Sequence, residues 1–246
     1  MKINLFFFVS NFNYGGASIA ILNLLKGLSR KKFNINIIYI GDSDYKKNIP
    51  SDVNIINIKT NKYFLKTFFG FFKIRKIILQ RIKNKKKNLF VSNINYSNIL
   101  SILFLRKIKN LKIFLYERTS LHELNLFFNL TNFIKNMIIK MFIRTIYPRA
   151  DKVITNSYTL KRELRFMFNV NADVIYSGTI EKILKKKKIK KKNYIKLISV
   201  GRFSNQKNHE FLIKMISKLK NIKYKLYIYG GGKLENDLTK LINNLG

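Results

Sequence analysis

The sequence predicts an α/β protein: an N-terminal unit with a mostly parallel sheet, followed by a second, incomplete unit of the same kind. Short apolar runs with strand character alternate with amphipathic helical segments along the 246 residues. The chain has 2 Pro and no Asn-Gly or Asp-Gly pair, which favours crossover connections over hairpins. A lysine-rich segment near residue 180 divides this alternation in two.

Seven short apolar runs are the strand candidates of the N-terminal unit. They are Ile3–Val9, Ile35–Ile40, Val53–Ile58, Leu89–Val91, Ile113–Tyr116, Val153–Thr155 and Val174–Tyr176. Amphipathic segments lie between several of them. In the first of these segments, the spacing of Ile21, Leu24, Leu25 and Leu28 predicts one apolar face of a helix.

The second unit repeats the alternation. We expect a strand over Ile195–Val200, a helix over Leu212–Leu219, a strand over Tyr224–Tyr229 and a helix over Leu234–Leu245. The predicted apolar face of the first helix is Leu212, Met215, Ile216 and Leu219, and that of the second is Leu234, Leu238, Leu241, Ile242 and Leu245.

These patterns divide the chain into an N-terminal domain over 1–180, a linker over 181–194 and a partial C-terminal domain over 195–246. The linker contains the run Lys182–Lys192, which has little to bury and repels itself. Two strands and two helices leave a parallel sheet uncovered at one edge. We therefore expect the chain to be truncated within its second domain.

The composition excludes several kinds of site. The chain has no Cys, so it has no disulfide and no thiolate metal site, and this fits a reducing compartment such as the cytoplasm. Its 2 His cannot build a metal site without a cluster of carboxylates, no such acidic cluster is seen, and no metal site is expected. The apolar start is too short for a signal peptide, and no apolar run is long enough to span a membrane.

The charge balance is strongly basic, with 49 Lys+Arg against 12 Asp+Glu and a formal net charge of +37. Such a field attracts nucleotide phosphates, anionic lipid and nucleic acid. It is also compatible with an ordinary surface in a chain that is biased toward lysine throughout. No nucleic-acid recognition motif is present, so we expect no specific nucleic-acid partner.

The first candidate site is the loop between the first strand and the first helix, where Gly15 and Gly16 allow close backbone approach. A helix N-terminus presents free N–H groups to an anion. The alternative is a tight turn without a ligand, because the pair is not the full dinucleotide-binding fingerprint.

Two further candidates follow the strands of the second unit. Arg202 and Lys207 come after Gly201, and Ser204 or Asn205 is placed to cap the next helix. Arg offers a planar fork to phosphate oxygens and Lys a compact charge. After the next strand, Gly230 and Gly232 belong to a glycine loop. Both loops lie at the carboxyl ends of parallel strands, where such sheets bind ligands. The alternatives are two ordinary exposed cations and a glycine-permitted turn.

Taken in order, these motifs resemble the retaining, nucleotide-sugar-dependent glycosyltransferases of the GT-B fold, family four ("glycosyl transferases group 1"). Four blocks carry the resemblance over nearly the whole chain: GGASIAILNLLKGLSRKKFNINII, ADKVITNSYTLKRELRFMFNVNADVIYSGTI, SVGRFSNQKNHEFLIKMISKL and YKLYIYGGGKLENDLTKLINNLG. The resemblance implies two Rossmann-like domains and no metal cofactor. It also implies that the donor is a nucleotide-diphosphate sugar and that the acceptor is a lipid-linked or polysaccharide chain.

The resemblance also assigns the candidate residues. Arg202 and Lys207 match the pair that neutralises the donor diphosphate. Gly15, Gly16, Gly230 and Gly232 match loops near the donor. Many members carry a histidine after the strand that corresponds to Ile113–Tyr116, whereas this chain has Glu117 and Arg118 there, with His122 slightly later. Glu117 and Arg118 are therefore weak candidates for contact with the sugar or acceptor, and His122 is interpreted as a loop residue.

Two basic stretches are candidates for contact with an anionic membrane surface. Residues 62–88 combine five Phe with many cations, and residues 133–149 carry Asn136, Lys140 and Arg144 in one polar stripe among apolar residues. The alternative is that both are packed helices of the N-terminal domain. The family resemblance implies work on lipid-linked acceptors at the inner face of the cytoplasmic membrane, and this favours the membrane interpretation.

Two functions follow from the sequence. The first is a glycosyltransferase in the synthesis of a cell-surface glycan such as lipopolysaccharide. The second is an inactive fragment that keeps at most acceptor or membrane binding. The family's acidic motif, two glutamates separated by seven residues, is expected beyond Gly246, and this favours the second. The sequence identifies neither the sugar, the nucleotide, the acceptor nor the oligomeric state.

Overall fold

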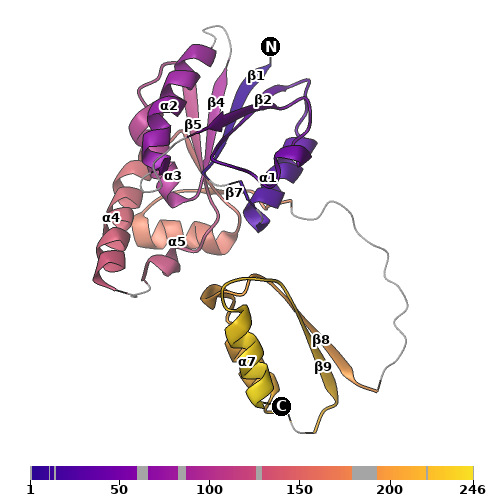
Figure 1. The fold of residues 1–246 in the computed structure, drawn as a ribbon. Coiled ribbons are helices and arrows are strands. Elements are labelled where there is room, and N and C mark those ends of the chain that lie inside the picture. The colour runs from indigo at the N-terminus through magenta and orange to yellow at the C-terminus, as the bar shows by residue number, and fades with distance from the viewer. Residues whose placement is uncertain are drawn as a thin grey trace. The chain divides into compact units, whose positions relative to one another are not determined.

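The computed structural model describes residues 2–10, 12–13, 15–59, 66–82, 87–125, 129–178, 193–219 and 221–245. The chain divides into two compact units, unit 1 over Met1–Ile183 and unit 2 over Leu184–Gly246 (Figure 1). Apart from residues 193 and 194, the predicted lysine-rich linker lies outside the described residues.

Unit 1 alternates strands and helices as the sequence predicts. Its elements are β1 Ile3–Val9, α1 Gly16–Gly27, β2 Phe33–Ile40, η1 Lys46–Asn48, β3 Asn54–Ile58, α2 Lys66–Arg81, β4 Asn88–Asn93, α3 Asn95–Leu105, β5 Leu111–Glu117, η2 Leu121–Asn125, α4 Leu130–Ile146, η3 Tyr147–Arg149, β6 Lys152–Thr155, α5 Tyr158–Phe168 and β7 Asp173–Val174.

The described strands of unit 1 form one seven-stranded sheet in the order β3-β2-β1-β4-β5-β6-β7. Every neighbouring pair is parallel. This confirms the predicted α/β class with a Rossmann-like parallel sheet. Two strands are shorter than predicted. β3 begins at Asn54 and not at Val53. β7 ends at Val174, because its neighbour β6 ends at Thr155 and offers no partner to Tyr176.

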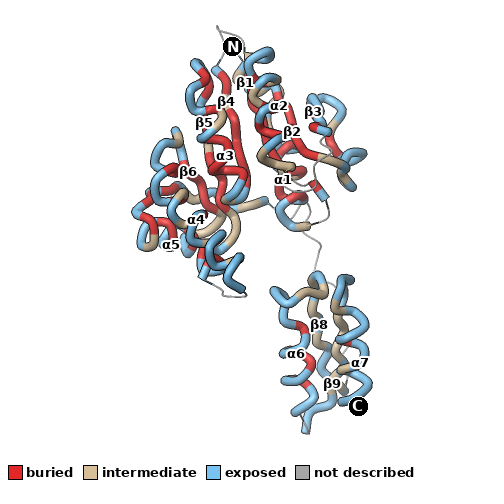
Figure 2. Tube along the Cα trace, turned by 60° about the vertical axis from the view of Figure 1, so that its left-hand side comes forward, coloured by how far each residue is buried: buried red, intermediate tan, exposed pale blue. Residues whose placement is uncertain are grey.

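The core of unit 1 lies on both faces of this sheet. Along β1, Phe6 and Phe8 join the apolar cluster on one face, and Leu5 and Phe7 join the cluster on the other. This is the pattern of a parallel strand that is buried on both sides. Figure 2 shows buried residues along these strands. The predicted apolar face of α1 is partly wrong, because Leu24 is exposed.

A group of hydrogen-bonded asparagines joins three strands at the amino end of the sheet. The Asn4 amide oxygen accepts from the side chains of Asn34 at 3.1 Å and Asn36 at 3.0 Å. The Asn4 amide nitrogen donates to Asn88 Oδ1 at 3.2 Å and to the Arg81 carbonyl at 3.3 Å. These bonds satisfy buried polar groups that are costly to leave unpaired.

Unit 2 is much smaller. Its elements are β8 Ile195–Val200, η4 Asn205–Lys207, α6 His209–Ile216, β9 Tyr224–Tyr229 and α7 Glu235–Leu245. The parallel pair β8-β9 is its described sheet. The predicted strands are confirmed. The predicted first helix is displaced toward the N-terminus, because its first turn begins after Asn208, which has a left-handed backbone with φ 49°.

The buried face of α6 also differs from the prediction. Ile213 and Ile216 are buried, whereas Met215 and Leu219 of the predicted face are 46% and 39% exposed. Apolar residues occupy most positions from 211 to 219, so periodicity does not distinguish adjacent faces, and packing against the narrow sheet selects one.

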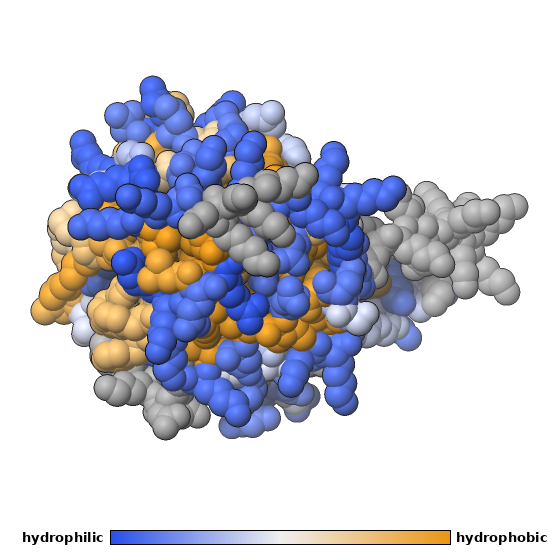
Figure 3. Space-filling view, turned by 90° about the horizontal axis from the view of Figure 1, so that it is seen from above, coloured by the Kyte–Doolittle hydropathy of each residue, from blue (hydrophilic) through white to orange (hydrophobic). Residues whose placement is uncertain are grey.

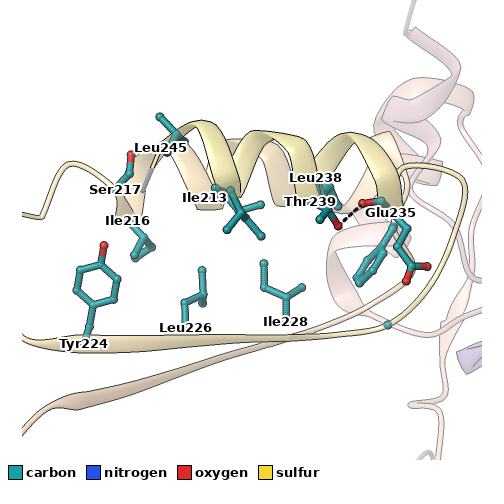
Figure 4. A pocket seen from close by; sticks show the side chains of 13 residues that line it. Ile213, Ile216, Ser217, Tyr224, Leu226, Ile228, Glu235, Leu238, Thr239 and Leu245 are labelled. Carbon is teal, nitrogen blue, oxygen red and sulfur yellow. Dashed lines mark hydrogen bonds between the residues drawn. The ribbon is translucent and has the colours of Figure 1, made fainter.

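The core of unit 2 is loosely filled. A cavity of about 510 Å³ lies between the sheet and the two helices. Figure 4 shows Leu226 and Ile228 pointing into it from β9, opposite Ile213 and Leu238 from the helices. Most of the residues that line it are apolar, and neither Arg202 nor Lys207 is among them, so we interpret it as an underfilled core and not as a ligand site.

Candidate functional site

The candidate site of unit 1 lies where the strand order of its sheet reverses. β1 and β4 are neighbours, but the chain runs outward from them in opposite directions, toward β2 and toward β5. Loops that leave the carboxyl ends of such strands diverge and form a crevice in which open α/β sheets bind ligands. The loops from β1, β4 and β5 carry the residues described next.

Arg118 connects the loop after β5 to the start of α1. Its Nη1 donates to the Ala17 carbonyl at 3.2 Å, and its guanidinium lies over the Tyr116 ring at 4.2 Å. Its Nε is buried and has no hydrogen-bond partner among the described residues. Burial lowers the pKa of the guanidinium, although it remains a cation at neutral pH. Arg118 therefore carries one buried hydrogen-bond donor that no described residue satisfies.

Glu117 is held inside unit 1, beneath the loop. Its Oε2 accepts from the Tyr147 hydroxyl at 2.6 Å and from the Asn98 amide at 3.4 Å, and its Oε1 accepts from the Arg118 backbone N–H at 3.2 Å. Burial raises the pKa of Glu117 to about 7, although these hydrogen bonds lower it in part. Because Glu117 is 0% exposed, it positions Arg118 and does not itself reach a substrate in this structure.

The two glycines of the first loop lie at the same edge of the sheet. Gly15 is the N-cap of α1 and Gly16 is its first residue. A Cβ at either position would meet no atom within 4 Å, so packing within unit 1 gives no reason for glycine there. The space beside these two residues is open to a ligand.

Sequence reasoning missed two residues at the end of β4. Asn93 donates to the Phe8 carbonyl at 2.9 Å, and its buried Oδ1 has no partner among the described residues. Ile94 caps α3 with φ 73°, a backbone conformation that is a genuine outlier for a β-branched residue. Such strain is concentrated at functional sites. No pattern in the sequence marks either position.

In unit 2, Arg202 and Lys207 lie on the connection that follows β8. Lys207 belongs to the single turn η4, which precedes α6. Ser204 is the N-cap of η4 but makes no side-chain cap hydrogen bond, so the predicted capping of the main helix by Ser204 or Asn205 is wrong. Both cations are exposed, and within the described part of the chain neither has an ion-pair partner.

Gly230 and Gly232 hold the second glycine loop against the first connection of unit 2. A Cβ at Gly230 would lie 1.9 Å from the Gly201 carbonyl oxygen, and one at Gly232 would lie 2.6 Å from the Phe203 carbonyl oxygen. Gly232 also has φ 152°. Backbone bonds from Gly201 N to Tyr229 O and from Phe203 N to Gly231 O, both 2.9 Å, join the two loops. These glycines therefore shape the loop that carries Arg202.

His209 is a residue of unit 2 that the sequence analysis left without a role. It is buried beside Gly201, 5.5 Å from the Phe203 ring and 3.5 Å from Ser199 Oγ, and its Nε2 has no partner among the described residues. It supports the loop of Arg202 and Lys207 from below. His122, by contrast, is exposed in η2.

Two further properties bear on the kind of site. Within the described ranges, no three His, Asp or Glu side chains are grouped so that they would hold a metal ion. Every helix among the residues described is too short or too polar to cross a bilayer.

These two units, each with glycine-bearing and cation-bearing loops after the carboxyl ends of parallel strands, define a two-part α/β protein of the GT-B class. The chain belongs to Glycosyltransferase Family 4, which matches residues 14–180, and residues 180–246 match the Glycosyl transferases group 1 family.

Two curated relatives are also glycosyltransferases by name, which agrees with the family assignment. One is the N-acetylgalactosamine-N,N'-diacetylbacillosaminyl-diphospho-undecaprenol 4-alpha-N-acetylgalactosaminyltransferase of Campylobacter jejuni, which is 26% identical over 97% of this chain and 65% of its own length. Another is an uncharacterised glycosyltransferase of Haemophilus influenzae, 24% identical over the same shares. The chain thus spans about two thirds of the length of these curated relatives.

Two solved structures share the fold. The lipopolysaccharide outer core galactosyltransferase WaaB has a TM-score of 0.67 at 14% identity, and the alignment covers 100% of this chain and 65% of WaaB. TarM has a TM-score of 0.71 at 13% identity, with 99% of this chain and 74% of TarM covered. Both support the GT-B architecture of the chain.

Proposed function

We propose that this protein transfers a sugar, with retention, from a nucleotide-diphosphate sugar to a lipid-linked or glycan acceptor in the synthesis of a cell-surface glycan. Membership of Glycosyltransferase Family 4 supports the reaction class. The name of the Campylobacter jejuni relative describes transfer to a diphospho-undecaprenol-linked sugar, which supports the acceptor class.

The observation that carries the proposal is the pair of cations on the connection after β8. Arg202 and Lys207 are exposed, have no ion-pair partner in the described part of unit 2, and lie beside a loop that Gly230 and Gly232 shape. We assign the donor diphosphate to them. Cations at this position stabilise the negative charge that the leaving nucleoside diphosphate develops as the glycosidic bond breaks, without a metal cofactor.

We assign the carboxyl edge of the unit 1 sheet to the acceptor and the transferred sugar. Arg118 supplies a cation, and the open space beside Gly15 and Gly16 supplies access to the first amides of α1. Glu117 and Tyr147 fix the backbone that carries Arg118. The acceptor class further implies that the protein works as a peripheral protein at the inner face of the cytoplasmic membrane.

The proposal is tested by calorimetric titration of the full chain with UDP, GDP and their common sugars. UDP comes first because a solved TarM structure contains it. We expect Arg202→Ala with Lys207→Ala to weaken binding at least about a hundredfold, since each charged hydrogen bond contributes about 1.5–3 kcal/mol. The matched control, Lys223→Ala with Lys240→Ala, removes the same charge from exposed positions of unit 2 and should bind as the parent does.

The titration has three informative outcomes. Loss of binding in the first variant alone supports a diphosphate site at this loop. Equal loss in both variants would show attraction by net charge only, and the assignment would fail. No binding of any of these ligands by the folded parent chain would favour the second function, an inactive fragment that keeps at most acceptor or membrane binding.

A further inference from the structure

The chain leaves the sheet of unit 1 through a short segment that is tied to it at both ends. Residues 175–178, called the exit segment, follow β7 and belong to no helix or strand. The Ile175 N–H donates to the carbonyl of Thr155, the last residue of β6, at 2.9 Å. At the other end, the Asn23 side chain of α1 donates to the Gly178 carbonyl at 2.9 Å. The exit segment therefore runs from the carboxyl end of β6 toward α1.

Between these two ends, the exit segment is held by Tyr116, a buried residue of β5. The Tyr116 hydroxyl donates to the Ile175 carbonyl at 2.6 Å and lies 3.4 Å from Ser177 Oγ. The Tyr116 carbonyl accepts from the Ile94 N–H at 3.1 Å, so the backbone of this strand end is also fixed. Because a tyrosine side chain is one rigid ring on two rotatable bonds, the bond at its hydroxyl restricts the plane of the whole ring.

The face of the same ring contacts Arg118. The guanidinium lies 4.2 Å from the Tyr116 ring centroid, and the face of an aromatic ring attracts such a cation. Hydrophilic side chains cover most of the molecular face in Figure 3, whereas Arg118 Nε is buried and has no hydrogen-bond partner among the described residues. The direction of this buried donor therefore depends on the ring beneath it.

We propose that Tyr116 is a positioning residue of the unit 1 site, through which the exit segment sets the orientation of the Arg118 guanidinium. The exit segment binds the hydroxyl and the guanidinium lies on the ring, so a shift of either partner tilts the side chain that the other contacts. The inference rests on the proposed function, because that function assigns Arg118 to the acceptor and the transferred sugar.

The alternative is that α1 alone holds the guanidinium. Arg118 Nη1 donates to the Ala17 carbonyl at 3.2 Å, and this bond would fix the cation without help from the exit segment. The two arrangements differ in what they predict for the Tyr116 hydroxyl. If α1 alone holds Arg118, removal of this distant hydroxyl has no effect on the guanidinium.

The Nε–H group of Arg118 gives a direct readout, because its proton lies beside an aromatic ring and its NMR signal depends on the orientation of that ring. The full chain is labelled with ¹⁵N and studied without ligand, and Arg118→Met identifies the signal by its loss. Tyr116→Phe keeps the ring and removes the bond to Ile175. We expect the signal to shift and its proton to exchange with water about three- to tenfold faster, the factor that one hydrogen bond contributes.

Two further variants separate the exit segment from the hydroxyl itself. Asn23→Ala releases the Gly178 carbonyl without changing the ring or the guanidinium, and it should shift the Arg118 signal in the same direction by a smaller amount. Tyr158→Phe is the matched control. It removes the same atom from a tyrosine whose ring lies edge-on to the ring of Tyr176, with centroids 6.3 Å apart, and it should leave the signal unchanged.

The second readout is taken at the exit segment, because coupling between two groups is reciprocal. The Ile175 amide proton should exchange about two- to fivefold faster in Arg118→Met, which removes the cation from the ring. In the double variant with Tyr116→Phe, the combined effect should fall short of the product of the single effects. Amides of β1 report the stability of unit 1 in the same spectra. If Tyr116→Phe lowers their protection as well, Asn23→Ala decides the question.

Three results would overturn the proposal. One is an Arg118 signal that is the same in the parent and in Tyr116→Phe, which would assign the guanidinium to α1 alone. Another is a shift in Tyr116→Phe that Asn23→Ala does not reproduce, which would confine the effect to the hydroxyl. The last is independent effects of Arg118→Met and Tyr116→Phe on the Ile175 amide. The samples contain no nucleotide, so a failure here is distinguishable from a failure of the UDP titration, which concerns unit 2.

Discussion

Unit 1 and unit 2 are built from the same strand–helix alternation, yet their interiors differ greatly. In unit 1 both faces of the sheet are covered, and side chains as large as Phe6, Phe8 and Tyr147 are 0% exposed. In unit 2 the sheet is covered on one face, and Ile198 and Val200 on the other face are 57% and 74% exposed.

This difference shows that the loops of the two units are held in place in different ways. The loops of unit 2 hold each other through backbone bonds and glycine contacts between Gly201, Phe203 and Gly230, with little help from a core. The loops of unit 1 rest on a filled interior through Glu117 and Tyr147. We therefore expect substitutions of equal size to have unequal effects in the two units.

The largest difference should come from one core substitution made in both units. Ile74→Ala in unit 1 removes a side chain that is 0% exposed, and we expect a loss of about 3–4 kcal/mol in the free energy of unfolding. Ile213→Ala in unit 2 enlarges a cavity that already exists, and we expect about 1–2 kcal/mol. Native-state hydrogen exchange of β4 and β9 amides reports each unit separately. Equal losses would contradict the comparison.

The next effect concerns a buried carboxyl that only unit 1 contains among the residues described. Burial raises the pKa of Glu117 from 4.5 to about 7, so the folded state holds its proton more tightly than the unfolded state. Its contribution to stability is complete below pH 4.5 and is lost as the pH rises to about 7. The loss amounts to about 3 kcal/mol, since one pKa unit corresponds to about 1.4 kcal/mol.

Glu117→Gln tests this pH dependence, because an amide does not titrate. Unfolding of unit 1 is measured from pH 4 to 8 in the parent and the variant, and their difference should change through this window. Glu210→Gln in unit 2 is the control, because Glu210 is exposed and its ion-pair partner among the described residues is Lys214. A pH-independent difference for Glu117→Gln would show that the carboxyl does not titrate there.

A smaller effect is expected at the amino end of the unit 1 sheet. Asn4→Ala removes the common partner of Asn34, Asn36 and Asn88, and with it the three side-chain hydrogen bonds that join β1 to β2 and β4 at this end of the sheet. We expect a loss of about 2 kcal/mol in thermal or denaturant unfolding of unit 1. Ser199→Ala in unit 2 should have almost no effect, because its contact to His209 is already 3.5 Å long. A neutral Asn4→Ala would mean that water replaces these bonds.

The smallest effect should be the same in both units. Lys152 pairs with Asp173 in unit 1 and Lys214 with Glu210 in unit 2, each at 2.6 Å and each largely exposed. Because solvent and salt screen such pairs, Lys152→Ala and Lys214→Ala should leave the Tm of either unit nearly unchanged. A clear loss in unit 2 alone would show that surface pairs compensate for its small core.

Much of the fold could be predicted from local signals. The strand runs Ile3–Val9, Ile195–Val200 and Tyr224–Tyr229 are found with the predicted bounds. Their β-branched and aromatic residues, bounded by turn residues, are sufficient to mark them. Arg202 and Lys207 could be singled out because a strand and a helix pattern bracket them.

Other features could not be predicted in the same way. The spacing of apolar residues in α4 does not distinguish a buried position from an exposed one, and only packing shows that the helix has apolar residues of both kinds. Likewise, Glu117 and Arg118 are adjacent in sequence but have different surroundings. Glu117 is buried and hydrogen-bonded to Tyr147, whereas Arg118 donates a hydrogen bond to the Ala17 carbonyl.

The sequence by itself determined the alternation of elements, the two-unit division, the resemblance to a family and the loops that carry its cations, since all of these depend on neighbours along the chain. Only the tertiary structure decided the strained Ile94, the buried Glu117–Tyr147 pair, the glycine contacts of Gly230 and the exposed apolar residues of α4. These features depend on which distant segments pack against each other, and that packing sets the burial, the backbone strain and the pKa of each residue.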